Sequence, residues 1–304
     1  MSMKIAFIGL GHLGCHLAHS LLEAGFDLTV CDLNEEAAAS LIDKGARFAG
    51  TPKATAENVD VVITCLPSPA ATETVITGPD GVLVSLGRGA TWIEMSTNDP
   101  EAIKELAALA EQKGVQTLEA PVTGGVHRAR SGEITVLVGG EEALFEAHRP
   151  LFEAMGGEVI HMGELGKASV IKVITNMLAF IHLIAAGEAM MLAKTADLDL
   201  TKAFQAIKAS SGNSFVHETE SQVILNGSYN IGFTMDLALK DLGIVQKLAR
   251  EQAIPMDLAS LTEQMFRRAS GHFGGDAWSP KVVKLLEDAM GTTLRAPGFP
   301  ETLT

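Results

Sequence analysis

The sequence predicts an α/β fold in which a parallel sheet is followed by an all-helical C-terminal domain. From Met1 to about His161, short apolar runs rich in β-branched residues alternate with Ala-, Leu- and Glu-rich segments. This alternation is typical of parallel strands covered by helices on both faces. After Gly166 the strand signals largely stop and helical patterns follow. We therefore predict two domains, residues 1–163 and 164–304.

The strands of the first domain are predicted from short apolar runs. These runs are KIAFIG at 4–9, LTVCD at 28–32, VDVVITCL at 59–66, TWIEMS at 91–96, VQTLE at 115–119 and ITVLVGG at 134–140. Helical segments such as EAIKELAALAEQKG at 101–114 lie between them. Helices of the second domain are predicted at 167–195, 200–210, roughly 214–226, 233–252, 257–270 and 279–290. One long helix starting near Lys167 is expected to join the two domains.

Composition and charge favour a protein that acts on a small molecule. The 304 residues include 37 acidic and 23 basic ones, and the resulting charge of -14 argues against a nucleic-acid surface. The three cysteines, Cys15, Cys31 and Cys65, are scattered and fit a reducing, cytoplasmic compartment. No signal peptide is expected, because the N-terminus leads almost directly into a strand. The apolar stretch 173–193 contains polar residues, so a buried helix is favoured over a membrane span.

The first strand is followed by a glycine pattern that is typical of phosphate-binding loops. Gly9, Gly11 and Gly14 form G-x-G-x-x-G between the strand KIAFI and a helical run. In this context the glycines allow a tight turn, close approach of the backbone to a pyrophosphate, and packing of helix on strand. His12 and Leu13 complete the loop at the helix N-terminus, where unbonded N–H groups attract anions. The alternative is an ordinary turn that binds nothing.

Asp32 extends this pattern toward a particular dinucleotide. It ends the next strand, LTVCD, about twenty residues further on, where a carboxylate accepts hydrogen bonds from ribose hydroxyls. The same carboxylate repels a 2′-phosphate, and the following residues Leu33 and Asn34 provide no arginine to attract one. The expected fold is therefore a Rossmann, doubly wound sheet, and the expected cofactor is NAD rather than NADP.

The same stretch also offers metal-ligand side chains. His12, His16 and His19 would share a helix face, and Cys15 lies beside them. Structural zinc needs four ligands in a closed set, and the sequence nearby offers no second cluster to complete it. We therefore predict no metal at this position.

Several separated motifs show that the chain resembles the β-hydroxyacid dehydrogenase family. This family includes 3-hydroxyisobutyrate dehydrogenase, tartronate semialdehyde reductase and, more distantly, 6-phosphogluconate dehydrogenase. The motifs are IAFIGLGHLG at 5–14, CLP at 65–67, STNDP at 96–100, EAPVTGG at 119–125, GKASVIKVITN at 166–176 and FTMDLALKDL at 233–242. Their order and spread along nearly the whole chain make the resemblance more specific than any single motif.

EAPVTGG brings the hydroxyl group of Thr123 next to two glycines. Successive backbone N–H groups at Gly124 and Gly125, unobstructed by side chains, can hold a carboxylate. Taken alone, the segment is equally consistent with an ordinary loop. The resemblance implies that these three residues bind the acid group of the substrate.

Lys172 and Asn176 lie at positions i and i+4 of the long helix, on one face that is otherwise apolar. Burying a lysine is costly unless it is paired or functional. A partly desolvated ammonium group exchanges protons more readily near neutral pH. The alternative is a lysine that extends to solvent and a structural asparagine. The resemblance implies that Lys172 is the catalytic acid/base and that Asn176 holds the substrate.

The resemblance implies further contacts from other segments. Phe233 and Asp241 would help to bind and enclose the substrate, and Lys240 would approach the cofactor, although Lys-Asp on such a helix is often only a solvated pair. Leu66 and Pro67 would border the adenosine side of the cofactor and Thr97 the nicotinamide side, since ligands bind at the carboxyl ends of parallel strands.

Two positions depart from the family pattern. Ala168 stands where a second glycine is usual, and Thr175 stands where a second asparagine is usual. Neither change removes Lys172 or Asn176, so dehydrogenation is still expected. Thr175 makes the usual substrate less certain.

The expected activity is reversible hydride transfer between NAD and a small 3-hydroxy acid, with 3-hydroxyisobutyrate as the leading substrate. Tartronate, succinic or sulfolactaldehyde-type semialdehydes and serine-like acids are alternatives, since a methyl-for-hydroxyl difference depends on the shape of the pocket. Imine reduction and a non-catalytic dinucleotide sensor are the competing functions, and Lys172 argues against both. A homo-dimer or homo-tetramer is expected from the long apolar helix, with no nucleic-acid or membrane partner.

Overall fold

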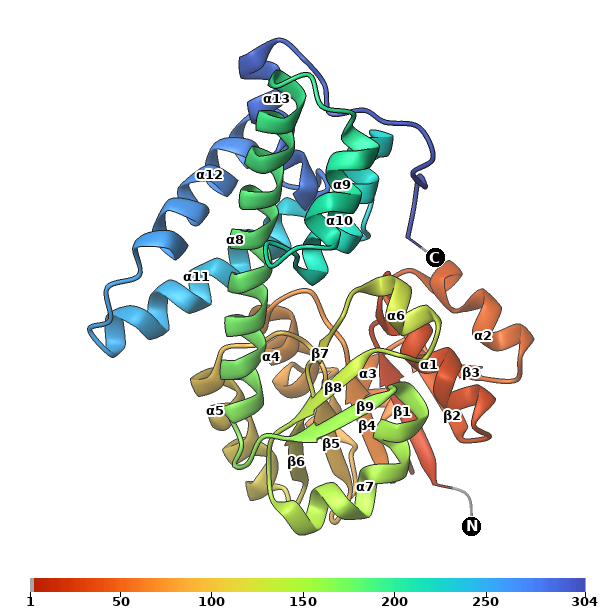
Figure 1. Ribbon diagram of the computed structural model, residues 1–304. Helices are drawn as coiled ribbons and strands as arrows, with labels where there is room; N and C mark the ends of the chain where they lie inside the picture. Colours follow the sequence, from red (N-terminus) through yellow and green to blue (C-terminus); the bar gives the residue numbers. More distant parts are fainter. Residues whose placement is uncertain (1–2, 304) are drawn as a thin grey trace. The chain divides into compact units, whose positions relative to one another are not determined.

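The computed structural model describes residues 3–303 (Figure 1). The chain forms two compact units, Met1–Lys172 and Val173–Thr304. The predicted domain boundary at 163/164 and this division lie close together, because the helix that begins at Lys167 contributes its first turns to the first unit.

The first unit is built on a six-stranded parallel sheet. Its strand order is β3-β2-β1-β4-β5-β6, which is the strand order of a Rossmann fold and confirms the predicted fold class. The strands are β1 Lys4–Ile8, β2 Asp27–Cys31, β3 Arg47–Phe48, β4 Val61–Thr64, β5 Thr91–Glu94 and β6 Gln116–Glu119. The sequence order reverses between β1 and β4, and in such sheets ligands bind at this reversal, beyond the carboxyl ends of the strands.

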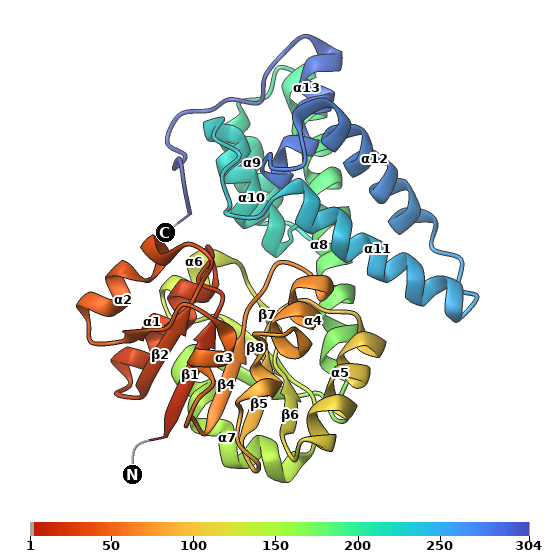
Figure 2. The same cartoon turned by 180° about the vertical axis from the view of Figure 1, so that it is seen from behind.

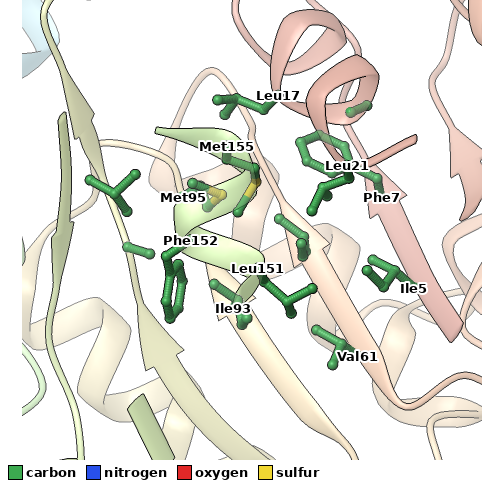
Figure 3. Packing of buried hydrophobic residues seen from close by; sticks show 14 of the residues in the cluster. Ile5, Phe7, Leu17, Leu21, Val61, Ile93, Met95, Leu151, Phe152 and Met155 are labelled. Carbon is green, nitrogen blue, oxygen red and sulfur yellow. The ribbon is translucent and has the colours of Figure 1, made fainter. Parts of the chain in front are cut away.

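Successive residues of each strand face opposite sides of the sheet, so each strand contributes to two cores. On one side Phe7 and Ile93 pack with residues of α1 (Gly14–Glu23) and α7 (Glu142–Met155), as Figure 3 shows. On the other side Ala6 and Trp92 pack with three further helices. These helices are α3 (Pro52–Thr55), α4 (Pro69–Thr77) and α5 (Pro100–Gln112). Three short elements complete this part: η1 Glu35–Ala38, α2 Ala39–Asp43 and η2 Val82–Val84.

The run ITVLVGG does not join the parallel sheet. Its strand β8 (Thr135–Val138) is the centre of a separate sheet, antiparallel to β7 (Val122–Thr123) and parallel to β9 (Glu158–His161). Between β7 and β8 lies the short helix α6 (Val126–Arg130). The apolar run predicts a buried strand correctly, but it carries no information about which partner the strand pairs with.

The second unit is helical, as predicted. Its helices are α8 Lys167–Thr195, α9 Leu200–Lys208, α10 Phe215–Asn226, α11 Met235–Glu251, α12 Asp257–Phe273 and α13 Lys284–Met290. The segment predicted as one helix at 279–290 begins with a 3₁₀ turn, η3 (Ser279–Val282), before α13. Antiparallel helices α11 and α12 lie side by side (Figure 2). Buried aromatic and aliphatic side chains form the core, among them Phe180, Phe204 and Phe266.

Helix α8 is long and apolar enough to cross a membrane by length and composition, and it is the one such helix among residues 3–303. Phe180, Leu183 and Met190 on this helix pack into the core of the second unit. Only 28% of its most apolar window is buried within one chain, so the prediction of a buried helix holds for part of its surface only. Exposed apolar side chains include Ile174 and Leu178.

Candidate functional site

The glycine loop follows β1 and has the geometry that its three glycines predict. Gly9 has a φ of 99°, and a Cβ there would lie 2.2 Å from the carbonyl oxygen of Cys65. A Cβ at Gly14 would lie 2.1 Å from the carbonyl oxygen of Gly9, so both positions require glycine. At Gly11, in contrast, a Cβ would meet no atom within 4 Å. The loop is therefore closed toward the sheet and open at Gly11, the position where a pyrophosphate would approach.

Helix α1 begins at Gly14, and no side chain caps its N-terminus. Its first turn also contains no acidic residue. Unbonded backbone N–H groups at the start of a helix bind anions. His12 is exposed and Leu13 is half-buried at this start of the helix.

Asp32 lies beside this loop. Its Oδ2 atom accepts a hydrogen bond of 2.7 Å from the backbone N–H of Leu10, and its Oδ1 atom accepts one of 2.9 Å from that of Asn34. Each carboxylate oxygen can accept a further hydrogen bond, for instance from a ribose hydroxyl. Exposed carboxylates of Glu35 and Glu36 follow. This acidic surrounding fits NAD and disfavours the 2′-phosphate of NADP.

The ends of β4 and β5 form a second part of this region through a buried hydrogen-bond chain. The hydroxyl group of Ser96 accepts the backbone N–H of Leu66 at 2.7 Å. Glu94 accepts the backbone N–H of Ser96 at 2.7 Å and the hydroxyl of Thr64 at 2.6 Å. The indole N–H of Trp92 donates to the same hydroxyl at 2.9 Å. Burial raises the pKa of Glu94 to about 7.

Three predicted cofactor contacts belong to these strand ends. Leu66 is held to Ser96 and lies against Gly9, since a Cβ at Gly9 would be 3.1 Å from its Cδ2 atom. Pro67 follows it directly, and Thr97 follows Ser96. The structure thus brings the loops after β1, β4 and β5 together at one edge of the sheet.

The segment predicted to bind the substrate acid follows β6. Thr123 lies in β7, and Gly124 and Gly125 both have positive φ angles, of 125° and 88°. Two successive residues in such conformations favour glycine. This geometry fits a loop that binds an anion.

Glu119, four residues before Thr123, connects this segment to the start of α8. Its carboxylate accepts the backbone N–H groups of Gly166 at 2.6 Å, Ala168 at 2.9 Å and Ser169 at 3.2 Å, and also the Ser169 hydroxyl. Burial raises the pKa of this carboxyl group, and the four hydrogen bonds oppose that shift. The first turn of α8 is therefore fixed to the end of β6.

Lys172 follows one turn after Ala168 on the same helix and is 8% exposed. Ala168, which replaces the usual glycine, is fully buried and donates to Glu119 without disturbing the helix. Glu119 thus connects two parts of the first unit. Its own strand leads into the loop at Thr123, and its carboxylate binds the helical turn that precedes Lys172.

Asn176 lies one turn further along α8, in the second unit, and Thr175 beside it is half-buried. The amide nitrogen of Asn176 donates to Asp241 Oδ2 at 2.6 Å, and Lys240 Nζ lies 2.7 Å from Asp241 Oδ1. Asp241 is 1% exposed and both its oxygens bind these partners. The geometry therefore supports an ordering role for Asp241, and direct contact of Asp241 with substrate stays a prediction.

Phe233 belongs to the same unit. Its ring stacks on that of Phe180 at a centroid separation of 6.1 Å, and its carbonyl oxygen accepts the backbone N–H of Ser279 at 2.9 Å. These contacts fix the segment just before α11. A role of Phe233 in enclosing the substrate stays a prediction.

One histidine of α1 has a hydrogen-bond partner, and burial affects two of them. His19 Nε2 lies 2.9 Å from the hydroxyl of Ser40, and burial lowers the pKa of both His16 and His19. Within residues 3–303 there is no group of three or more side chains of His, Cys, Asp or Glu that could hold a metal.

Glu94 and Glu119 are not among the predicted site residues. Each is an acidic residue inside an apolar strand segment, TWIEMS or VQTLE, where a charge is unexpected. That local contradiction is the signal that could have identified them.

The strand order and the loop beside Asp32 define a dinucleotide-binding protein of the Rossmann class. Residues 4–163 match the family described as the NAD binding domain of 6-phosphogluconate dehydrogenase. Residues 166–286 match the family described as NAD-binding of NADP-dependent 3-hydroxyisobutyrate dehydrogenase.

Individual proteins are similar over nearly the whole chain. The 2-(hydroxymethyl)glutarate dehydrogenase of Eubacterium barkeri is 31% identical, over 96% of this chain and 98% of that protein. The L-threonate dehydrogenase of Cupriavidus necator is 35% identical, over 94% and 96%. A crystal structure of 3-hydroxyisobutyrate dehydrogenase from Salmonella typhimurium superposes with a TM-score of 0.87 at 32% identity, covering 93% of this chain and 100% of that one.

The chain therefore belongs to the β-hydroxyacid dehydrogenase family. This confirms the resemblance that the motifs indicate, and it confirms an NAD-dependent hydroxyacid dehydrogenase at the level of the family.

Proposed function

We propose that this protein transfers a hydride reversibly between NAD and C3 of a small 3-hydroxy acid, with Lys172 as the acid/base. The observation that carries the proposal is the connection made by Glu119. Its carboxylate fixes the start of α8, which carries Lys172, to the strand end that leads into the Thr123–Gly125 loop. A proton-transfer group and an anion-binding loop on one rigid support are what this reaction requires.

NAD, when bound, supplies the acceptor or donor of the hydride. The residues that would hold it are Gly9, Gly11, His12, Leu13, Gly14, Asp32, Leu66, Pro67, Thr97 and Lys240. The open position at Gly11, the uncapped start of α1 and the carboxylate of Asp32 support this assignment.

The residues of the chain bind the substrate and move one proton. Thr123, Gly124 and Gly125 hold the carboxylate through a hydroxyl and backbone N–H groups. Lys172 Nζ takes the proton of the C3 hydroxyl during oxidation and returns a proton to the aldehyde oxygen during reduction. Asn176 orients the reacting carbon, and its amide is held in place by Asp241. Phe233 and the Lys240–Asp241 pair order the surroundings.

We propose 3-hydroxyisobutyrate as the simplest substrate. The similar proteins named above act, by their names, on 2-(hydroxymethyl)glutarate, L-threonate and 3-hydroxyisobutyrate. These compounds share a hydroxy acid and differ in the group at the far end. The alternatives are tartronate and succinic semialdehydes, whose reduction gives hydroxy acids, sulfolactaldehyde-type aldehydes, which carry a sulfonate, and serine-like acids.

We also propose that the enzyme is cytoplasmic and assembles as a homo-dimer or homo-tetramer, with a functional division at residues 163/164. The support for assembly is the exposed apolar surface of the second unit, which includes Leu192, Leu258 and Leu261. Large exposed apolar surfaces usually bind other protein surfaces. Size-exclusion chromatography with light scattering tests this directly.

The test of the reaction is the formation of reduced nicotinamide from NAD or NADP across a panel of 3-hydroxy acids. Lys172→Ala is expected to lower kcat by about 10²- to 10⁴-fold, the usual range for a general acid/base, while NAD binding persists. Asp32→Ala is expected to weaken the preference for NAD. Activity of Lys172→Ala equal to that of wild type would refute the assignment.

Two other functions give different results in the same assay. A wild-type protein that binds NAD and oxidises no hydroxy acid, yet reduces a cyclic imine, would be an imine reductase. One that binds NAD and turns over neither class would be a dinucleotide sensor. The presence of Lys172 favours the hydroxy acid.

A further inference from the structure

The segment around the proposed acid-binding loop is positively charged in an otherwise acidic protein. Residues 120–132 contain His127, Arg128 and Arg130 and no Asp or Glu, although the whole chain carries a charge of -14. All three residues belong to α6 (Val126–Arg130), which starts immediately after Gly125. A local reversal of charge beside a ligand loop indicates which ligands it attracts.

The side chain of Arg128 folds back onto this loop. A Cβ placed on Gly124 would lie 3.0 Å from Arg128 Cδ and 3.6 Å from Arg128 Cβ. The aliphatic part of the arginine side chain therefore lies against one side of Gly124. Arg128 is half-buried in this position. The imidazole of His127 lies similarly against Gly125, where an added Cβ would be 3.1 Å from Nδ1.

The other two basic residues of α6, His127 and Arg130, do not place a positive charge beside the Gly124–Gly125 loop. Burial lowers the pKa of His127, with the nearby Arg128 and Arg130 adding to the shift, so its imidazole is neutral at pH 7. Arg130 is exposed, and its charge acts on His16 of α1, whose pKa is lowered by burial and further by this charge. Arg128 is therefore the permanently charged residue of α6 whose side chain lies against the Gly124–Gly125 loop.

We propose that Arg128 binds a second carboxylate of the substrate, so that the preferred substrate is a dicarboxylic 3-hydroxy acid. This inference rests on the proposed function, which assigns the first carboxylate to Thr123, Gly124 and Gly125. A guanidinium presents paired N–H donors that match both oxygens of a carboxylate. A methyl group at the same position would leave that charge without an acceptor from the substrate.

The test compares two acids that share the C3 alcohol and the first carboxylate. In 3-hydroxyisobutyrate the C2 substituent is a methyl group, and in 2-(hydroxymethyl)succinate it is a carboxymethyl group. Wild type is expected to show a kcat/KM about 10-fold or more higher for the diacid, because charge-assisted hydrogen bonds are among the strong ones.

Arg128→Ala is expected to lower kcat/KM for the diacid by about 10- to 100-fold, mainly through KM, and to change that for 3-hydroxyisobutyrate by less than about 3-fold. Arg128→Lys should fall between, because it keeps the charge and loses the paired donors. Arg130→Ala is the matched control and should behave as wild type with both acids.

Two results would overturn this inference and leave the proposed function intact. One is an equal loss of kcat/KM for both acids in Arg128→Ala, which would mean that Arg128 binds the carboxylate that both acids share. The other is a higher kcat/KM of wild type for the monoacid. Failure of wild type to oxidise either acid would instead overturn the proposed function, and the inference with it. Matching melting temperatures of wild type and Arg128→Ala ensure that a loss is not one of folding.

Discussion

The ends of two neighbouring strands use the same residue type for different purposes. Glu94 ends β5 and Glu119 ends β6, and the two are paired in the register of the sheet. Both are buried, and burial raises the pKa of both. Glu94 holds the loops at Ser96 and Leu66 on the proposed cofactor side, whereas Glu119 holds the first turn of α8 on the proposed substrate side.

The two carboxylates differ in what depends on them. Glu119 accepts three backbone N–H groups and a hydroxyl from one helical turn, so it replaces the cap that a helix start needs. Glu94 accepts the backbone N–H of Ser96 and side-chain hydroxyl groups, and Ser96 in turn accepts the backbone N–H of Leu66. The comparison indicates that Glu119, at the end of β6, is needed for α8 to start where it does. Glu94, at the end of β5, orders a loop whose position can change without loss of a helix.

The largest effect is expected from Glu119→Ala. Removing the carboxylate leaves buried N–H groups of Gly166 and Ala168 without their acceptor, which costs about 1–3 kcal/mol for each unsatisfied group. We expect a loss of about 3 kcal/mol or more in the free energy of unfolding, measured by urea denaturation. Glu146→Ala removes an exposed carboxylate paired with Arg149 and should leave the free energy of unfolding nearly unchanged. An equal loss of unfolding free energy in Glu119→Ala and Glu146→Ala would contradict a structural requirement for Glu119.

A smaller, more specific effect is expected when each carboxylate becomes an amide. Glu94→Gln should raise KM for NAD by about 10-fold and change KM for the hydroxy acid little, because it loosens the loop at Leu66. Glu119→Gln should lower kcat and leave KM for NAD unchanged, because it displaces the turn before Lys172. The same pattern in both variants would remove the distinction between the two strand ends.

The smallest effect is expected in the pH dependence of stability. Burial raises the pKa of Glu94 from 4.5 to about 7, so folding favours its protonated form. The stabilisation is complete below pH 4.5 and is lost as the pH rises through about 7. We expect the fall in the free energy of unfolding between pH 4.5 and about 7, measured by urea denaturation, to be smaller in Glu94→Gln, because its amide does not titrate. Part of the slope should persist, since burial also raises the pKa of Glu119 and that of Glu220. An unchanged slope would show that Glu94 is charged throughout.

Local patterns in the sequence predicted those features that depend on neighbouring residues. The glycine loop at Gly9 and the bounds of α8 follow from spacing and periodicity, and both agree with the structure. The pairing of β8 in a separate sheet, in contrast, depends on distant partners, since β9 lies beyond α7. Glu119 binds Gly166 across 47 positions of the sequence, and no local pattern specifies such a contact.

The site shows the same division. The spacing of Lys172 and Asn176 predicts a shared helix face, and the two do lie on successive turns of α8, while their roles in the site stay predictions. The partner that fixes the Asn176 amide, Asp241, is 65 positions away, and its buried position was not predicted. The contact of the Arg128 side chain with Gly124 depends on a side-chain conformation that cannot be predicted from the sequence pattern.

The carboxylate of Asp32 has a consequence for how this lineage could change its cofactor during evolution. One oxygen binds the backbone of Leu10 inside the glycine loop, so the residue that selects against a 2′-phosphate also shapes the loop that would hold the pyrophosphate. Replacing Asp32 to admit NADP would therefore weaken the binding of both dinucleotides at first. We therefore expect a change of cofactor to need a second substitution that restores the contact to the backbone of Leu10.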